Sequence, residues 1–129
     1  MRVHLDADFL IYAVARGGPE RERLRELVRS DSILQMSAVA WYEFARGPRT
    51  PEQLALARGQ LEENDGVVEL SEALAVRAAD AFRALGSPRK RAADVAIGVT
   101  AASLGATLVT RNRRDFAGIP DLIVEVVKS

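Results

Sequence analysis

The sequence predicts a three-layer α/β/α domain built on a five-stranded parallel sheet. Short runs of apolar, β-branched residues alternate along the chain with longer segments of helical periodicity. Strands that are separated by helices pair in parallel, and the connecting helices then cover both faces of the sheet. With 129 residues and no linker-like stretch, the chain is expected to fold as one domain over residues 1–129.

Strands are expected where apolar and β-branched residues run together between turn residues. Their predicted bounds are Arg2–Leu5, Ile33–Met36, Val67–Leu70, Thr107–Thr110 and Leu122–Val127. Helices are expected where apolar residues recur at helical spacing. Their predicted bounds are Asp8–Ala15, Pro19–Ser30, Ala38–Arg46, Pro51–Glu63, a segment between Ser71 and Gly86, and Ala92–Leu104.

Capping residues and helix breakers set the helix boundaries in chain order. Gly17-Gly18 ends the first helix, and Pro19 opens the second. Ser37 is placed to cap the third helix, and Thr50 begins a capping box with proline at the first helical position. Ser71 caps the fifth helix. The sixth helix is alanine-rich and apolar nearly all round, so we expect it to be buried.

The composition excludes several classes of protein. The chain has no cysteine, which excludes a disulfide framework, a zinc–thiolate site and a cysteine nucleophile. No stretch approaches the roughly 18 apolar residues that a membrane span needs, and Asp6 interrupts any apolar signal region. We therefore expect a soluble, cytoplasmic protein with no membrane partner.

The distribution of charge is more informative than its sum. Net charge is zero, with 18 basic and 18 acidic residues, so bulk electrostatics do not indicate a nucleic-acid binder. Two basic clusters stand out, namely Arg89-Lys90-Arg91, and Arg111 with Arg113-Arg114. The planar guanidinium of arginine suits bidentate contacts with phosphate. The alternative interpretation is that these side chains are solvated residues of loops and helix ends.

Four carboxylates occupy positions that a purely structural account explains poorly. Asp6 ends the first predicted strand, and Asp115 follows the fourth. Glu43 lies inside an otherwise apolar helix, and Asp94 begins the most apolar helix of the chain. Each alone has an ordinary explanation as a helix cap, a partner of the helix dipole or one half of an ion pair. Together they mark the strand ends and flanking helices where parallel α/β sheets bind their ligands.

Converging carboxylates repel one another, and a divalent cation removes that penalty. A ligand set made of oxygens alone, without histidine or cysteine, favours Mg²⁺ or Mn²⁺ over zinc. Such ions activate water and neutralise charge on a phosphodiester. Because the arginine clusters lie just before Asp94 and around Asp115, the sequence predicts a metal-dependent nuclease.

The chain resembles the PIN-domain family over its whole length, and within it the VapC toxins of bacterial toxin–antitoxin pairs. The most specific stretch is Leu108–Phe116, and the segments around Asp6, Glu43 and Asp94 follow the family's order and spacing. The resemblance implies a five-stranded parallel sheet and an endoribonuclease whose catalytic acids are these three and Asp115. It also implies that the three aspartates bind the metal, while Glu43 orients the attacking water or binds a second ion.

Further positions and partners follow from the same resemblance. Thr110 and Asn112 match polar positions that shape the pocket, and we expect Arg113 and Arg114 to contact the substrate. Asp8 is interpreted as a cap of the first helix, with an added carboxylate at the site as the alternative. The expected partners are RNA, a VapB-type antitoxin that inserts a C-terminal segment into the active-site groove, and a second copy in a homodimer.

Three other functions are weighed against this one. Asp6 and Asp8 at the end of a first strand also suggest a haloacid-dehalogenase-type phosphatase, and the length suits a response-regulator receiver domain. The phosphatase would need a late pair of aspartates that the chain lacks, and the receiver an aspartate where Ser71 stands. The third alternative is an inactive PIN-fold scaffold that only binds RNA or protein.

Overall fold

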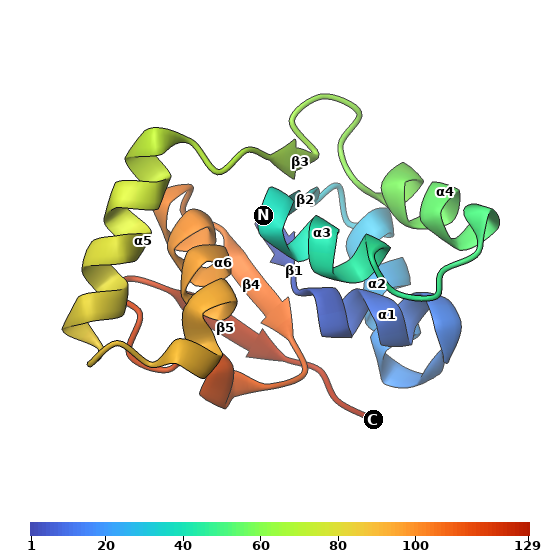
Figure 1. Ribbon diagram of the computed structural model, residues 1–129. Coiled ribbons are helices and arrows are strands. Elements are labelled where there is room, and N and C mark those ends of the chain that lie inside the picture. Colours follow the sequence, from blue (N-terminus) through green and yellow to red (C-terminus); the bar gives the residue numbers. More distant parts are fainter.

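The molecule is organised around a five-stranded sheet, as the computed structural model of residues 1–129 shows (Figure 1). The strand order is β3-β2-β1-β4-β5, and every neighbouring pair is parallel. This confirms the predicted α/β/α architecture with five parallel strands. The strands are β1 (Arg2–Leu5), β2 (Ile33–Ser37), β3 (Val67–Val68), β4 (Thr107–Thr110) and β5 (Ile123–Val126).

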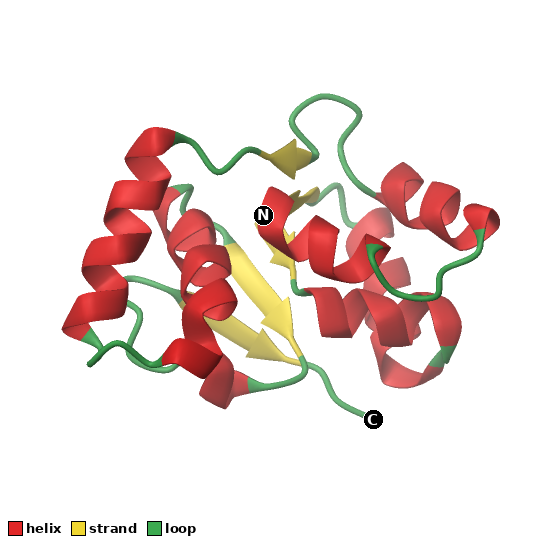
Figure 2. Cartoon of the chain, viewed as in Figure 1, coloured by secondary structure: helices red, strands yellow, loops and turns green.

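Helices flank this sheet in two groups, with α5 and α6 packed together on one side and α1 to α4 gathered on the other (Figure 1 and Figure 2). None of them has the length and apolar character needed to cross a membrane. The α-helices are α1 (Ala7–Ala15), α2 (Gly18–Arg29), α3 (Ala38–Ala45), α4 (Pro51–Gln60), α5 (Glu72–Ala84) and α6 (Ala92–Ser103). Two short 3-10 helices are η1 (Arg89–Arg91) and η2 (Arg113–Phe116).

Side-chain caps explain where several helices begin. The hydroxyls of Ser37 and Ser71 each accept a hydrogen bond from a backbone N–H three residues later, which caps α3 and α5. At the start of α4, Thr50 accepts from the backbone N–H of Gln53, and the Gln53 side chain accepts from that of Thr50. These contacts satisfy N–H groups that have no partner within the helix. The three predicted helix starts are confirmed.

Five elements are shorter than predicted: β5 lacks one residue at each end, α3 and α6 each end one residue early, and the differences at β3 and α4 are larger. β3 spans only Val67–Val68, because its partner β2 ends at Ser37, and the two residues that follow β3 have no strand to pair with. The helix that was expected to reach Glu63 ends at Gln60. Leu61 adopts an extended backbone there and is buried in the core, which prevents another helical turn.

The hydrophobic core contains 23 buried apolar residues, to which the central strands β1 and β4 and helix α6 contribute. α6 is buried over most of its length, as its composition predicted. Gly98 allows close packing, because a Cβ at this position would lie 2.5 Å from Cδ1 of Ile119. This packing holds α6, whose first turn carries Asp94, against the segment between β4 and β5.

Candidate active site

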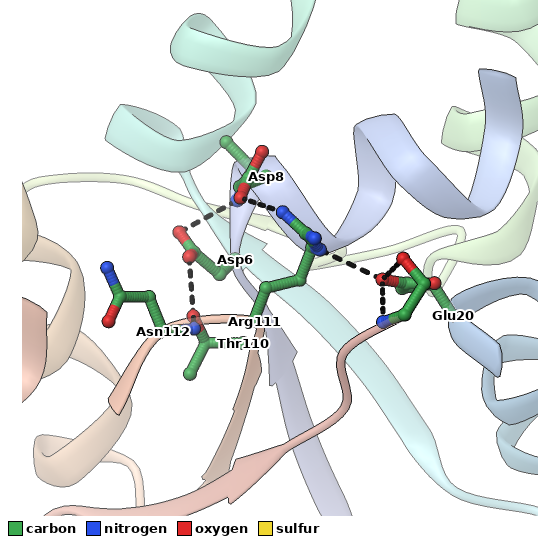
Figure 3. A network of polar contacts seen from close by, with 8 residues as sticks. Asp6, Asp8, Glu20, Thr110, Arg111 and Asn112 are labelled. Carbon is green, nitrogen blue, oxygen red and sulfur yellow. Dashed lines mark hydrogen bonds and ion pairs between the residues drawn. The ribbon is translucent and has the colours of Figure 1, made fainter. Parts of the chain in front are cut away.

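Asp6 lies at the carboxyl end of β1, where the strand order reverses between β1 and β4. Its Oδ1 accepts a hydrogen bond from the backbone N–H of Ala7 at 2.9 Å, which makes Asp6 the N-cap of α1. Its Oδ2 accepts a hydrogen bond at 2.8 Å from the hydroxyl of Thr110, the last residue of the neighbouring strand β4 (Figure 3). Asp6 is 6% exposed, so both contacts fix a buried carboxylate at the switch point.

Glu43 and Asp94 join Asp6 at this place. Glu43 lies on α3, and Asp94 lies in the first turn of α6. One carboxylate oxygen from each of the three residues lies within 4.8 Å of the other two. We call these three residues the acidic triad. All its donors are oxygens, and no histidine or cysteine belongs to it, so its chemistry suits a hard divalent cation.

Asp115 lies near the acidic triad without joining its compact set of oxygens. Its charge nevertheless raises the pKa of both Asp94 and Glu43, so the four predicted acids act on one another. Two side chains hold the segment that carries Asp115. Arg91 donates from Nε to the backbone carbonyl of Asp115 at 3.1 Å, and Oδ1 of Asn112 accepts from the backbone N–H of Arg114 at the start of η2.

Burial and mutual repulsion raise the pKa values of the acidic triad. The pKa of Asp94 is raised to about 7 by burial first and then by the charges of Asp115, Asp6 and Glu43. Burial raises the pKa of Asp6 to about 6, against the lowering effect of its hydrogen bonds from Thr110 and the following backbone N–H. Burial also raises the pKa of Glu43. Close carboxylates of this kind gain most from a neutralising cation.

These shifts predict how stability depends on pH when no divalent cation is present. The folded-state pKa of Asp94, about 7, exceeds its ordinary value of 3.8, so the folded chain binds more protons than the unfolded chain between these values. The contribution of Asp94 to the free energy of unfolding is therefore largest at low pH, and it is lost as pH rises through about 7. The free energy of unfolding of Asp94→Asn, taken relative to that of wild type, should rise by about 2 kcal/mol between pH 4 and pH 8, after allowance for partial exposure.

Urea denaturation in EDTA at several pH values, with Asp80→Asn as the control, measures this gain. Asp80 is an exposed acid of α5 that pairs with Arg83 and lies outside the acidic triad, so its replacement leaves the repulsion among the triad carboxylates unchanged. A difference between wild type and Asp94→Asn that stays constant from pH 4 to pH 8 would contradict the raised pKa.

Two arginines that the sequence placed in phosphate-attracting clusters are bound to protein groups instead. Arg91 holds the backbone carbonyls of Asp115 and Ala117. Arg111 donates to Asp8 and Glu20 and is largely buried. The exposed cations of the two clusters are Arg89, Lys90, Arg113 and Arg114.

The polar positions expected to shape the pocket differ in accessibility. Thr110 is fully buried, and its hydroxyl donates to Asp6 while accepting from the backbone N–H of Asn112. Asn112 is exposed, and its side chain caps η2. The preferred interpretation of Asp8 as a helix cap is wrong, because Asp6 is the cap. Asp8 lies one residue further into the first turn of α1, where Arg111 pairs with it.

Sequence reasoning missed Glu20, which is fully buried and binds Arg111. Nothing in the sequence distinguishes it, because α2 begins with alternating acidic and basic residues, Glu20 to Arg23, and charged residues at the start of a helix are expected to face solvent. The largest cavity, about 600 Å³, is also separate from the acids. It is bounded by Arg2 at the start of β1 and by Leu104 after the end of α6, and no member of the acidic triad lines it.

Comparison with known proteins identifies the fold. The family profile described as PIN domain matches residues 3–122. The structure is similar to VapBC2 from Rickettsia felis bound to a promoter DNA fragment (20% identity, 98% of this chain and 99% of that chain, TM-score 0.75). It is also similar to VapBC-1 from nontypeable Haemophilus influenzae (27% identity, 98% of each chain, TM-score 0.70).

A further similar structure is FitAcB from Neisseria gonorrhoeae (22% identity, 95% of each chain, TM-score 0.64). No curated protein matches the chain by sequence. The profile covers nearly the whole chain, and solved structures of VapBC toxin–antitoxin complexes share its architecture from end to end. The chain therefore belongs to the PIN domain family, and the resemblance to its VapC-type members is confirmed.

Proposed function

We propose that this protein is a divalent-cation-dependent endoribonuclease and the toxin of a VapBC-type toxin–antitoxin pair. One observation carries the proposal: three acids distant in sequence converge within 4.8 Å at the switch point of the sheet. The triad brings together one buried and two half-buried carboxylates with raised pKa values, and a bound cation would offset their repulsion. PIN-family membership and the VapBC neighbours support RNA cleavage as the reaction. They also argue against the phosphatase and receiver alternatives.

Mg²⁺ or Mn²⁺ fits the donor set of this site. Asp6 and Asp94 would hold the ion, with Glu43 and Asp115 near enough to complete the same site or a second one. A bound divalent cation supplies an activated water and neutralises charge on the phosphodiester. Thr110 and the cap of α1 fix the orientation of Asp6. Glu43 would orient the water that attacks phosphorus.

The test is cleavage of total RNA by the purified, antitoxin-free protein with Mn²⁺ or Mg²⁺. Discrete fragments are expected, and they should vanish in EDTA. Mapping the new ends would identify the substrate and the position of the cut. Absence of cleavage together with absence of cation binding at millimolar Mn²⁺ would favour the alternative of an inactive scaffold.

Exposed arginines beside Asp115 would guide the RNA backbone. We expect the double variant Arg113→Ala/Arg114→Ala to weaken RNA binding and to flatten its salt dependence, because each guanidinium that contacts a phosphate releases counterions. The slope of log affinity against log salt should fall by about 1.4 for two contacts with single-stranded RNA. Fluorescence anisotropy in an Asp94→Asn background, where cleavage is prevented, gives this slope.

The control for this measurement is Arg25→Ala/Arg29→Ala, which removes two exposed arginines from α2, a helix that carries none of the four acids. An unchanged slope in Arg113→Ala/Arg114→Ala, or an equal change in the control, would contradict the assigned role of Arg113 and Arg114.

The VapBC neighbours also support the proposed partners. We infer a VapB-type antitoxin that covers the active-site groove, a toxin homodimer and a cytoplasmic location. The profile match over residues 3–122 supports a single domain over residues 1–129. Co-expression with the protein encoded next to this gene, followed by size-exclusion chromatography, tests the complex. Loss of RNA cleavage on complex formation is the expected result.

A further inference from the structure

Arg111 is a cation held inside the protein rather than at its surface. Its side chain is 13% exposed, although it follows Thr110 at the edge of the candidate active site. Nε donates to Oε2 of Glu20 at 2.8 Å, and Nη1 donates to Oδ2 of Asp8 at 3.0 Å. The guanidinium carbon also lies 3.4 Å from the ring centre of Tyr12. Figure 3 shows the guanidinium between Asp8 and Glu20, so one side chain joins the end of β4 to α1 and α2.

Glu20 is a fixed anchor for this arginine. Its side chain is fully buried, and its Oε2 also accepts from the backbone N–H of Ser129 at 3.0 Å and from the Ser129 hydroxyl at 3.1 Å. Oε1 has no partner. Burial alone would raise the pKa of Glu20, but backbone hydrogen bonds and the bond from Arg111 hold it below its usual value. The carboxylate therefore stays charged and keeps the guanidinium in place.

Asp8 is the other residue that Arg111 binds, and it has no such constraint of its own. Its side chain is 52% exposed, in the first turn of α1 and two residues after Asp6. A solvated acid in this position needs no buried arginine to stabilise it. The neighbouring side chains suggest why one is present. Thr110, the last residue of β4, holds Asp6, and Asn112 caps η2, so the residues on both sides of Arg111 each fix one part of the site.

We propose that Arg111 is a positioning residue: anchored by Glu20, it holds Asp8, which lies beside Asp6 (Figure 3), as an additional carboxylate that strengthens divalent-cation binding by the acidic triad. This inference rests on the proposed function, because it assigns a cation to the triad. The positioning role explains why Asp8 is bound by the guanidinium of Arg111, which the buried Glu20 already fixes. Outer residues that orient metal-binding groups commonly change metal affinity by about 10- to 100-fold.

The fork of the guanidinium is essential to this role. Arg111 uses separate nitrogens for Glu20 and Asp8, whereas a lysine ammonium is a single centre on a flexible stem. In Arg111→Lys the ammonium should stay with the buried Glu20, because an unpaired buried carboxylate is costly. Asp8 would then lose its partner while the net charge of the site is unchanged.

A double-mutant cycle on the full chain tests this, with Mn²⁺ affinity measured by titration calorimetry. Arg111→Lys and Asp8→Asn should each weaken Mn²⁺ binding by about tenfold. The two changes combined should weaken it no further, because Arg111 acts through Asp8. Thermal denaturation without Mn²⁺ is recorded for every variant, so that a loss of folded protein is not mistaken for a loss of Mn²⁺ affinity.

The matched control is Arg23→Lys, which makes the same change in another arginine that bridges two acids, Glu125 and Glu26, away from the triad. Its Mn²⁺ affinity should equal that of wild type. Unchanged affinity in Asp8→Asn, or additive effects of the two changes, would overturn the positioning role while leaving the proposed function intact. Failure of the wild type to bind Mn²⁺ would overturn both.

Discussion

Replacement of Asp94 by asparagine is expected to reduce RNA cleavage by more than about a hundredfold while the fold is retained. Asp94 contributes an oxygen to the acidic triad, and its pKa is raised to about 7 by burial first and then by the charges of Asp115, Asp6 and Glu43. Asparagine preserves the size of the side chain and removes the charge that a divalent cation requires. Initial rates on an RNA identified in the wild-type digestion measure the loss.

The control is again Asp80→Asn, in which an exposed acid of α5 is changed in the same way. It should cleave RNA at the wild-type rate. Adding Mn²⁺ should raise the melting temperature of wild type and of Asp80→Asn, but scarcely that of Asp94→Asn, because only a ligand that binds the folded state stabilises it. Full activity in Asp94→Asn would remove the acidic triad from the reaction.

Removal of Glu20 is expected to have the largest effect on stability. Glu20→Ala leaves the guanidinium of Arg111 partly buried with Asp8 as its remaining partner, and it leaves the backbone N–H of Ser129 without its acceptor. Breaking a buried ion pair on one side costs about 3–5 kcal/mol. For a domain of this size we expect the melting temperature to fall by roughly 10 °C or more. Differential scanning calorimetry gives this value directly.

Glu26→Ala is a suitable comparison, because Glu26 lies on the same helix and pairs with an arginine, but at the surface. Exposed pairs contribute about 0.2–1 kcal/mol, so its melting temperature should change little. Equal losses in the two variants would mean that the Glu20 pair is no stronger than a surface contact.

Much of the fold could be predicted from the sequence because its signals are local. The capping box at Thr50 and the serine caps at Ser37 and Ser71 depend on residues three positions apart, and the structure confirms each of them. Strand and helix order follows from periodicity, which is also local. The convergence of Asp6 with Asp94 could be anticipated, because parallel strands end at one edge of the sheet, and a helix that leads back to the start of the next strand begins at that same edge.

The remaining features depend on contacts between distant segments. The length of β3 is set by where β2 ends, and nothing within β3 itself records this. Arginines of one basic cluster looked alike in sequence, yet Arg111 is bound by Glu20, 91 residues away, while Arg113 is exposed. The aromatic residues beside Glu43 also differ in burial, since Phe44 is fully buried and Tyr42 is 63% exposed. Only tertiary packing distinguishes such neighbours.

The bond between Thr110 and Asp6 joins residues that are 104 positions apart. During synthesis the ribosome makes Asp6 long before β4, the strand whose Thr110 orients it. A nascent chain that stops before β4 contains Asp6, Glu43 and Asp94 without the pairing that brings β1 against β4 and without the Thr110 hydroxyl that fixes Asp6. The orientation of Asp6 is therefore completed only after β4 has been made.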